Sequence, residues 1–559
     1  MEKKEMSMET RLLLAFLLMG LVLFGTQYLY KPPPAAKPPA KAQSSEPAQA
    51  KTAPDAAPVT KTPAPAVAEP AEIPGQIHAD KEETFAIDTD YYHVEFSNKG
   101  AVVRSWVLKA YKDRNGKPLE LVNPQAPGKV PAPFSLAFKN PPATDPNNGL
   151  FAVKRTGNDV EFEYSDGRLL VKKSFAFRQK SYLVAVRSEV TDNGTLAPHT
   201  LEWRGGFGDQ TISNAASTEH AVYYDQSNSK LYEKDAKEAK NGPVSFSGQF
   251  SYAGIEDQFF AAVFLPEKPG PMEITVYSDS VPAASGGDQP RVGAAVGGDG
   301  VNAFSLFVGP KDTDLLGRVD KKLESLIDWG WFEIIAKPLF LVMNWTADHW
   351  IHNWGWTIIL VTVAITMLLF PLRISSMKSA RKMQRLQPQI KAINEKYKNV
   401  KLNDPRKQEQ NEELMALYKR EGVNPVGGCL PMLIQLPFLY AFYRVLAVSI
   451  SLRGAGWLWV HDLSQPETLP IRMLPVILII TQFLTQKMTP APGVDPSQQK
   501  MMMFMPLVLG YMFYFLPSGL VLYYLTSNLV GILQQWILNR GATPAPAAVE
   551  AKPAAKRKK

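Results

Sequence analysis

The chain has 559 residues, which is enough for several domains, and it carries a formal net charge of +8. Its single cysteine, Cys429, excludes an internal disulfide framework, and we expect that residue to be a small apolar packing residue. The near-neutral overall hydropathy averages two different parts, one polar and strand-like, the other helical with long apolar runs. A basic excess by itself does not distinguish a nucleic-acid partner from an anionic membrane surface.

The amino-terminal end holds the first long apolar run, "LLLAFLLMGLVLFGTQYLY" (12–30), which follows three basic residues. A run of roughly 20 apolar residues is long enough to cross a bilayer, and the tyrosines near its end suit the membrane interface. We therefore expect an uncleaved transmembrane anchor over residues 1–30, with its amino end in the cytoplasm. A cleaved secretory signal stays open as the alternative, because small residues follow directly. Residues 31–79 are rich in Pro, Ala, Lys, Thr and Glu, and they predict a disordered, extended linker.

Residues 80–317 show a period of two with frequent turn signals, and they predict a large antiparallel β-sandwich. Two alternating runs flank Asn98-Lys99-Gly100, and two more flank Asp166-Gly167, which is a strong hairpin signal. The strand-like runs that follow are "SYLVAVRSEV", "QFFAAVFL", "MEITVYS" and "NAFSLFVG". The histidines of this region have no metal-ligand spacing, so we expect surface or core residues at His93, His199 and His220.

Residues 318–336 predict one amphipathic helix, because apolar residues recur at helical spacing. The apolar face consists of Leu323, Leu326, Ile327, Trp331 and Ile334, while most charged residues lie elsewhere. The tryptophans favour a helix that lies in the membrane interface. An ordinary helix packed on the sandwich is the alternative.

Five further apolar runs predict a membrane core over residues 337–538. They are 354–372, 429–450, 469–486, 501–516 and 519–538, with a tight turn at Pro517-Ser518-Gly519 between the last two. With the anchor they give a polytopic fold of six transmembrane helices that has both termini on one side. Basic residues outnumber acidic ones thirteen to six in 373–423 and six to one in 540–559. In 452–468, by contrast, Arg453 is the single Lys or Arg. The positive-inside rule then places both termini in the cytoplasm and the sandwich in the periplasm.

Residues 373–423 predict a cytoplasmic helical hairpin, because two helical patterns of similar length have a short connection. The second helix begins with Asp404 as its cap and Pro405 in its first turn, and it ends at Gly422. Its basic surface would suit anionic lipid, RNA or a ribosome, and a merely solvated surface is equally compatible with the pattern. Residues 539–559 predict a basic cytoplasmic tail.

Polar side chains within the predicted spans form the candidate site. They lie toward the cytoplasmic half of the spans and comprise Thr362, Thr366, Gln435, Gln482, Gln486, Tyr524 and Asn528. Each alone is typical of an interhelical hydrogen bond. Together, without a charged residue at mid-span, they favour a wet groove open to the cytoplasm over an ion-coupled pathway with buried carboxylates. The third span would not form a straight, tightly packed rod, because it contains Pro425, Gly427, Gly428, Pro431 and Pro437.

Four stretches carry a resemblance to a known family: "YKREGVNPVGGCLPMLIQLPFLYAFYRVL", "WLWVHDLS", "QKMTP" and "FLPSGLVLYYLTSNLVGILQQ". They closely resemble the YidC/Oxa/Albino membrane protein insertases, and the anchor, linker and sandwich resemble the Gram-negative form of that family in layout. The resemblance implies a five-helix insertase core in the bacterial inner membrane that receives nascent membrane proteins and helps them fold, alone or beside the Sec translocon. It implies no cofactor, no metal and no covalent catalysis. A ribosome and anionic lipid are further partners that the basic hairpin and tail would suit.

One position departs from the family's pattern. The family usually places an arginine in the groove on the second span, and an ungapped count from "NWGW" to "FPLR" puts Thr366 there. Arg373 lies seven residues later on the same helical face. Either Arg373 supplies a positive charge from the floor of the groove, or polarity alone suffices, and we favour polarity alone.

Two other classes of protein fit the sequence less well. An intramembrane hydrolase would need a catalytic motif, yet the sequence has no His-Glu-x-x-His, and Ser518 lacks a Gly-x-Ser-Gly setting. His349 and His352 have the helical spacing of metal ligands, but they lie among tryptophans at the expected outer interface. A small-solute transporter would favour internal repeats and mid-membrane charges, and the sequence shows neither.

Overall fold

The computed structural model describes residues 75–212, 215–268, 270–283, 286–397, 404–422, 430–488 and 496–540. The expected anchor, the linker up to residue 74 and the tail beyond Arg540 lie outside these ranges, as do Cys429 and the helix breakers before it. The chain divides into two compact units. One contains the hairpin residues 388–423, and the other contains the sandwich and the remaining helices.

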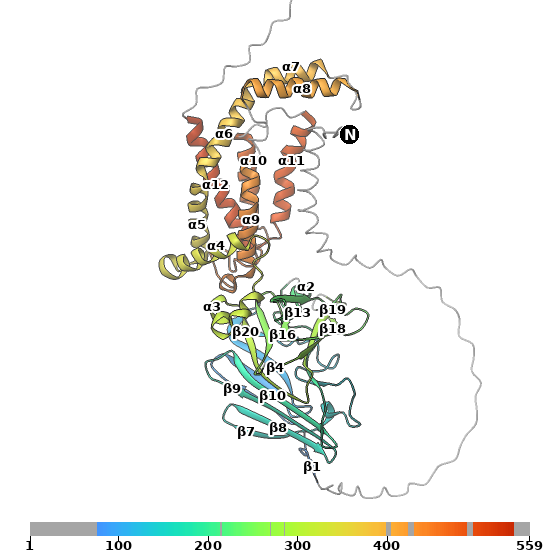
Figure 1. Cartoon of the computed structure of the whole chain (residues 1–559). Helices are drawn as coiled ribbons and strands as arrows, with labels where there is room; N and C mark the ends of the chain where they lie inside the picture. The colour runs from blue at the N-terminus through green and yellow to red at the C-terminus, as the bar shows by residue number, and fades with distance from the viewer. Residues whose placement is uncertain are drawn as a thin grey trace, which may run out of the picture. The chain divides into compact units, whose positions relative to one another are not determined.

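β-strands dominate the amino-terminal part of the larger unit, as the period of two predicts (Figure 1). The strands are β1 Gln76–Ile77, β2 Thr84–Asp88, β3 Tyr92–Ser97, β4 Val102–Lys112, β5 Pro118–Glu120, β6 Leu136–Ala137, β7 Ala152–Thr156, β8 Asp159–Asp166, β9 Leu169–Phe177, β10 Leu183–Asp192, β11 Thr195–Leu196, β12 Thr200–Trp203, β13 His220–Asp225, β14 Lys230–Lys234, β15 Val244–Gly248, β16 Phe250–Glu256, β17 Phe260–Pro266, β18 Met272–Pro282, β19 Asp288–Gly297 and β20 Val301–Pro310. Two short helices, η1 Pro146–Asn148 and α2 Ala215–Thr218, interrupt them.

The described strands form three sheets. Their orders are β1-β8-β9-β10-β20-β17-β16-β13-β14, β15-β18-β19-β12-β6 and β2-β3-β4-β5, and β7 and β11 pair with β8 and β10. Neighbouring strands such as β8, β9, β10 and β20 run antiparallel. This arrangement confirms the predicted class of the domain.

One hydrophobic core joins the three sheets, because alternate side chains of each strand point into it. The ring of Phe96 on β3 lies 5.0 Å from Phe175 on β9, and Trp106 on β4 lies 6.1 Å from Trp203 on β12. Aromatic contacts of this kind bury large apolar areas between sheets. The core therefore fixes the three sheets against one another.

Both predicted hairpin turns are present. The turn between β3 and β4 contains Gly100 at φ +73°, and the turn between β8 and β9 contains Gly167 at φ +91°. A Cβ on Gly100 would lie 2.6 Å from the carbonyl oxygen of Asn147, so this turn requires glycine.

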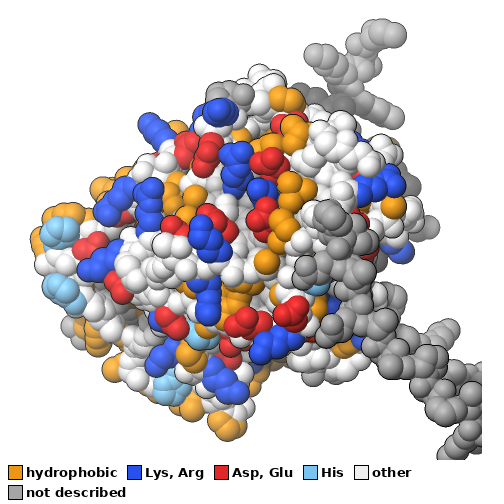
Figure 2. Space-filling view, turned by 90° about the horizontal axis from the view of Figure 1, so that it is seen from below, with side chains coloured by type: hydrophobic (Ala, Val, Ile, Leu, Met, Phe, Trp, Pro, Cys, Tyr) orange, Lys and Arg blue, Asp and Glu red, His pale blue; other side chains and the backbone are white. Residues whose placement is uncertain are grey.

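Figure 2 shows acidic and basic side chains intermingled on the face that it presents. That mixture is typical of a solvated surface rather than of a nucleic-acid interface.

The single helix expected over 318–336 is not formed. The structure has α3 Thr313–Val319, a 3₁₀ turn η2 Lys321–Leu326, a non-helical stretch, and then α4 Glu333–Thr346. Gly330 causes the break, because it has φ +71° and a Cβ there would lie 2.6 Å from the hydroxyl of Tyr440. Asp328 is held to α9 (Leu430–Val448) as well, since its carbonyl oxygen accepts from Nε of Arg444 at 3.1 Å. Tertiary contacts thus override the helical period.

The two halves of that segment differ in what surrounds them. Leu323, Leu326 and Ile327 are buried, and Tyr252 of the sandwich lies 2.7 Å from the hydroxyl of Ser325. The first half is therefore packed on the sandwich. In the second half, Trp331 and Ile334 are each 86% exposed. Further along α4, Leu341, Val342 and Trp345 are exposed too. This apolar face keeps the features of an interfacial helix.

Helices make up the carboxyl-terminal part of the larger unit. They are α4, a π-helical turn η3 Ala347–Ile351, α5 Trp354–Leu368, α6 Phe370–Arg385, α9 Leu430–Val448, η5 Ile450–Leu452, α10 Met473–Met488, α11 Pro496–Phe513 and α12 Ser518–Arg540. The last four apolar runs coincide with α9 to α12, whereas the run 354–372 is divided between α5 and α6. By length and mean hydropathy together, none of the helices in the described ranges meets the requirement for crossing a bilayer. The number of crossings stays a prediction.

The smaller unit is the predicted helical hairpin. Helix α8 (Arg406–Arg420) lies antiparallel to α7 (Gln387–Lys396), because Gln410 donates to Asn394 at 2.8 Å and Arg420 donates to Gln389 at 3.3 Å (Figure 1). The apolar side chains between the two helices are buried at Ile390, Tyr397 and Leu417. The expected ends are confirmed too, since Asp404 accepts from the backbone N–H of Arg406 at 3.0 Å and Gly422 has φ +61°.

Candidate functional site

Helix α12 is the centre of the candidate site, because it packs against α5, α9 and α10, which carry the other predicted residues. The amide of Gln435 on α9 donates to the hydroxyl of Ser527 on α12 at 3.2 Å. Pro437 lies inside α9 and lacks the N–H of a regular helix ladder, so the helix is weakened beside Gln435. The structure therefore brings Gln435 next to the part of α12 that carries Tyr524 and Asn528.

Two side-chain amide nitrogens of this site lack an acceptor at hydrogen-bonding distance among the described residues. The side chain of Gln482 on α10 faces the hydroxyl of Tyr524, whose ring stacks on Phe513 of α11 with centroids 4.9 Å apart. Within the described residues, the buried Nε2 of Gln482 and Nδ2 of Asn528 have no acceptor. A buried donor without an acceptor costs about 1–3 kcal/mol. Both amides are thus suited to donate to a carbonyl, a carboxylate or water that enters.

These residues are named the amide cluster below: Gln435, Gln482, Tyr524, Ser527 and Asn528. They come from three helices, and their polar atoms lie among apolar side chains of the same bundle. Gln486, predicted with them, lies one turn beyond Gln482 on α10 and is half-buried.

Thr362 and Thr366 use their hydroxyls within their own helix. Their Oγ1 atoms donate to the carbonyl oxygens of Ile358 and Thr362, at 2.6 and 2.7 Å. Thr362 is buried, and both hydroxyls are satisfied by the carbonyl four residues earlier. The expectation that these threonines hold water in a groove therefore stays a prediction.

Arg373 lies on α6, beyond the break that ends α5, rather than on one continuous helix with Thr366. Its Nη1 donates to Oε1 of Gln534 at 3.3 Å, and Gln534 donates to the carbonyl oxygen of Thr366 at 3.5 Å. The guanidinium also packs on Gly531, where a Cβ would lie 2.4 Å from Nη2. Arg373 therefore contacts α12 about one turn beyond Asn528.

Sequence reasoning missed two members of this region, Ser527 and Gln534. Gln534 is 2% exposed and joins α6, α12 and the last turn of α5. A signal was available, since Gln534 follows Tyr524, Asn528 and Gly531 at intervals of four and three residues along one face of α12.

The two histidines with the helical spacing of metal ligands, His349 and His352, have other contacts in the structure. No three His, Cys, Asp or Glu side chains of the described ranges gather where they could hold a metal ion. The Nδ1 atom of His349 lies 3.0 Å from the carbonyl oxygen of Trp345, on which its ring also stacks. His352 ends the π-helical turn at φ +55°. These two histidines therefore belong to the local structure after α4.

Comparison with known proteins gives the class of the chain. The family described as "YidC periplasmic domain" matches residues 84–342, and the family described as "60Kd inner membrane protein" matches residues 346–545. The "Membrane protein insertase YidC" of Ralstonia nicotianae is 34% identical over 471 residues, which cover 82% of this chain and 83% of that relative. The insertase of the same name from Bordetella avium is 36% identical over 482 residues, with the same two shares.

The chain belongs to the YidC family of membrane protein insertases. Two solved structures are similar over 82% of this chain. One is described as an active YidC insertase with its first transmembrane domain resolved (21% identity, TM-score 0.35, 94% of that chain covered). The other is YidC from Thermotoga maritima (15% identity, TM-score 0.29, 98% covered).

Proposed function

We propose that the chain inserts nascent membrane proteins into the bacterial inner membrane and helps them fold, through a polar groove lined by the amide cluster. The observation that carries the proposal is the pair of buried amide donors, on Gln482 and Asn528, that lack acceptors in the described structure. In helices that serve only to pack, buried donors are normally paired. Peptide carbonyls and acidic side chains of a client would supply the missing acceptors during passage.

The energetic gain lies in a shorter path through apolar surroundings. A charged side chain at the centre of a bilayer costs about 2.5–3.5 kcal/mol on insertion scales. Each polar side chain of the groove, and each water that it admits, lowers this cost for the hydrophilic segment of a client. The work is binding and release, with no covalent step, so the function needs neither a cofactor nor a metal.

The apolar segment of the client would leave toward lipid along α9 and α11. The supporting observation is the row of exposed apolar side chains on α11, at Phe504, Val508 and Tyr511, which Phe515 continues just beyond the end of the helix. Large exposed apolar patches are typical of surfaces that meet lipid or an apolar partner. The hydrophilic segment of the client would thus contact the amide cluster, while its apolar segment contacts the exposed apolar side chains of the same bundle.

The proposed topology has the sandwich in the periplasm, and the hairpin and both termini in the cytoplasm, with six crossings. The exposed apolar face of α4 would then lie in the outer interface, and the basic hairpin and tail would face anionic lipid and the ribosome. The Sec translocon is the proposed partner for clients with large translocated domains. Cysteines introduced near Asn399 in a Cys429→Ser background should resist an impermeant reagent in intact cells, and strong labelling there would reject this topology.

Insertion by the purified protein tests the proposal most directly. Proteoliposomes should insert a short client with a hydrophilic translocated tail, as measured by protease protection of that tail. Replacing Gln482 and Asn528 together by leucine should lower insertion several-fold, because the donors are lost at similar side-chain volume. The matched control is Thr526→Val on the same helix, since that hydroxyl bonds only its own helix at Leu522. Full insertion by the double leucine variant would reject the proposed path.

A further inference from the structure

The loop between α9 and α10 (residues 449–472) fixes the first turns of two helices. The backbone carbonyl of Gln465 accepts from the N–H and the hydroxyl of Ser518 at 2.8 and 2.7 Å, and the carbonyl of Leu463 accepts from the N–H of Gly519 at 2.9 Å. These bonds hold the start of α12. The carboxylate of Glu467 accepts from the N–H of Leu474 at 2.8 Å and so caps the first turn of α10.

The same loop also fixes the start of α5. The side chain of Asn353 donates to the carbonyl oxygen of Gly456 at 3.1 Å. The ring of Trp457 occupies the space beside Gly355, where a Cβ would lie 2.2 Å from it. Because the loop continues from α9, it joins the ends of all four helices that carry the predicted polar residues.

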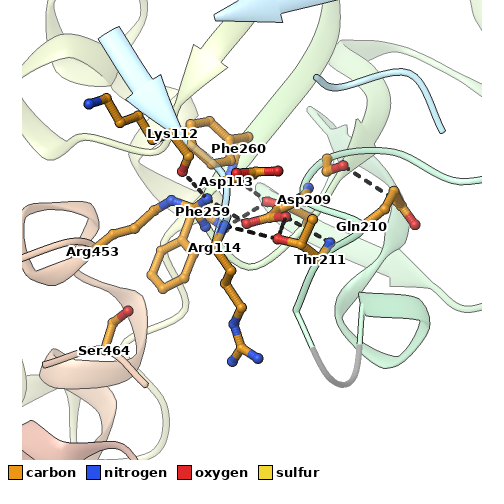
Figure 3. A network of polar contacts seen from close by, with 12 residues as sticks. Lys112, Asp113, Arg114, Asp209, Gln210, Thr211, Phe259, Phe260, Arg453 and Ser464 are labelled. Atoms are coloured by element: carbon orange, nitrogen blue, oxygen red, sulfur yellow. Dashed lines mark hydrogen bonds and ion pairs between the residues drawn. The ribbon is translucent and has the colours of Figure 1, made fainter. Parts of the chain in front are cut away.

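Arg453 anchors this loop to the sandwich, as Figure 3 shows. Its guanidinium forms an ion pair with Asp209 and donates to the carbonyl oxygen of Lys112 at 2.9 Å. The rings of Phe259 and Phe260 lie 5.7 and 5.3 Å from its Cζ. The side chains of Arg453 and Asp209 are only 8% and 1% exposed. Three separate segments of the sandwich thus enclose one guanidinium, and they are named the arginine receptacle below.

The arginine receptacle is organised by contacts of the sandwich alone. Asp257 accepts from the backbone N–H groups of Asp209, Phe259 and Phe260 at 3.0, 2.7 and 2.6 Å, so it fixes the carboxylate and both rings together. Thr211 donates from its backbone N–H and its hydroxyl to the other oxygen of Asp209. Gly208, at φ +85°, must be glycine, since a Cβ would lie 1.9 Å from the carboxylate of Asp257.

Burying this ion pair is a costly way to gain stability. Desolvation of the two charges offsets most of their attraction, and an apolar pair of similar volume often stabilises as well or better. A guanidinium enclosed by a carboxylate, a backbone carbonyl and two aromatic rings instead gives a single geometry. Three neighbouring contacts add to it: Gln258 donates to the carbonyl oxygen of Ala447 at 2.8 Å, Arg114 donates to the side-chain oxygen of Gln465, and Ile450 packs in the core of the sandwich.

We propose that Arg453 is a positioning residue, through which the sandwich sets the starts of α5, α10 and α12 and thereby the spacing of the amide cluster. The inference rests on the proposed function only in treating that cluster as the path of the client. Arg453 touches neither the cluster nor a client. It acts through the loop, whose backbone carbonyls hold Ser518, Gly519 and the side chain of Asn353.

Hydrogen exchange of the full-length protein in nanodiscs tests this role independently of activity. Arg453→Gln should accelerate exchange of the amides of Ser518, Gly519 and the 453–463 segment by about tenfold or more, because the loop loses its anchor. Strands β8 and β9, away from the joint, should be unchanged. The matched control is Arg187→Gln, since Arg187 is an exposed arginine of β10 paired with Glu189. It should leave all of these amides unchanged.

Arg453→Lys serves as the conservative variant, because it keeps the charge but loses the planar fork. We expect exchange between the parent and Arg453→Gln. Insertion should fall with Arg453→Gln for neutral-tailed and acidic-tailed clients alike. Unchanged exchange at Ser518 and Gly519 in a folded Arg453→Gln protein would overturn the inference, and so would equal acceleration throughout the sandwich. Failure of the parent protein to insert any client would reject the proposed function while leaving the exchange result to decide the role of Arg453.

Discussion

Arg373 separates two explanations of how the amide cluster attracts clients. In the structure its guanidinium bonds Gln534 and packs on Gly531, so it already has a role in holding α12 to α6. If polarity alone suffices, Arg373→Gln should insert acidic-tailed clients nearly as well as the parent, since glutamine retains an amide donor of similar reach. Proteoliposome insertion of two clients that differ only in tail charge measures this.

Thr366→Arg provides the control for Arg373→Gln, because it places an arginine at the position where the family resemblance leads us to expect one. Under the polarity explanation this variant is tolerated and changes little. A different result would favour the charge explanation: selective failure of Arg373→Gln on the acidic-tailed client, with recovery when Thr366→Arg is added. That pair of results would show that a fixed positive charge is required.

At the scale of elements, the sandwich contains a buried histidine that should make its stability depend on pH. His199 lies 2.7 Å from the hydroxyl of Ser188 and 3.0 Å from the carbonyl oxygen of Ala197, contacts that suit a neutral ring. Burial lowers its pKa to about 4. The folded state therefore binds fewer protons than the unfolded state between about pH 6.5 and 4, and stability present above that window is lost as the pH falls through it.

His199 should contribute a loss of about 3 kcal/mol to the free energy of unfolding of the sandwich from pH 6.5 down to 4, and the difference between the parent and His199→Asn isolates this contribution from that of the buried carboxyls. Thermal unfolding of the full-length protein in detergent, followed by near-ultraviolet circular dichroism, would detect it as a falling midpoint. The fall should be much smaller in His199→Asn. It should persist in His93→Asn, because burial is slight at His93 and a bond to Asp88 raises the pKa of that ring. An equal fall in His199→Asn would exclude His199 as the cause.

The helical hairpin should be removable without unfolding the rest of the chain. It forms a compact unit by itself, with its own buried edge at Ile390, Tyr397 and Leu417. Replacing residues 388–422 by a short Gly/Ser linker should leave the thermal midpoint of the bundle unchanged while reducing insertion. The reason for the second effect is loss of a basic surface that we propose meets incoming clients or ribosomes. Undiminished insertion and growth would leave the hairpin as a solvated projection.

Local signals explain which elements the sequence predicts correctly. The turns at Gly100 and Gly167, the strand alternation and the cap at Asp404 are all encoded within a few residues, and each is present. The helix expected over 318–336 fails because its disruption depends on Tyr440 and Arg444, more than a hundred residues away. No periodicity within 318–336 contains that information.

The candidate site shows the same division. Helical spacing grouped Tyr524 with Asn528, and the structure adds a bond from Gln435 to Ser527 on the same helix, which no spacing within either helix contains. The position of Arg373 could not be predicted from an ungapped count, because the helix breaks after Leu368 and a new helix begins with Phe370. The arginine receptacle was also missed, since Lys112, Asp209 and Phe259 come from three distant segments with no shared motif.

At the scale of the whole molecule, the sandwich should support insertion without performing it. A variant that lacks residues 85–300 should retain measurable insertion, because the amide cluster and hairpin lie outside that range. It should insert less than the parent, since Arg453 no longer has Asp209 and Phe260 as partners. Adding Arg453→Gln to this deletion should have no further effect, whereas the same substitution lowers insertion in the intact chain.

Two outcomes would contradict that scheme. Complete loss of insertion by a stable, correctly embedded deletion variant would assign the sandwich a direct part in client transfer. Additive losses from the deletion and Arg453→Gln would mean that Arg453 acts through something other than the sandwich.

The arginine receptacle is complete before its arginine has been made. Its last component, Phe260, precedes Arg453 by about 190 residues, and Asp209 precedes it by 244. At a synthesis rate of about 5–20 residues per second, the receptacle waits on the order of 10–40 s with its carboxylate facing water. The loop therefore docks on the sandwich late in synthesis, only after α9 has been made. Nascent chains stalled before residue 453 should bind an added arginine-bearing peptide that the finished protein excludes, and equal binding by both would refute this order of assembly.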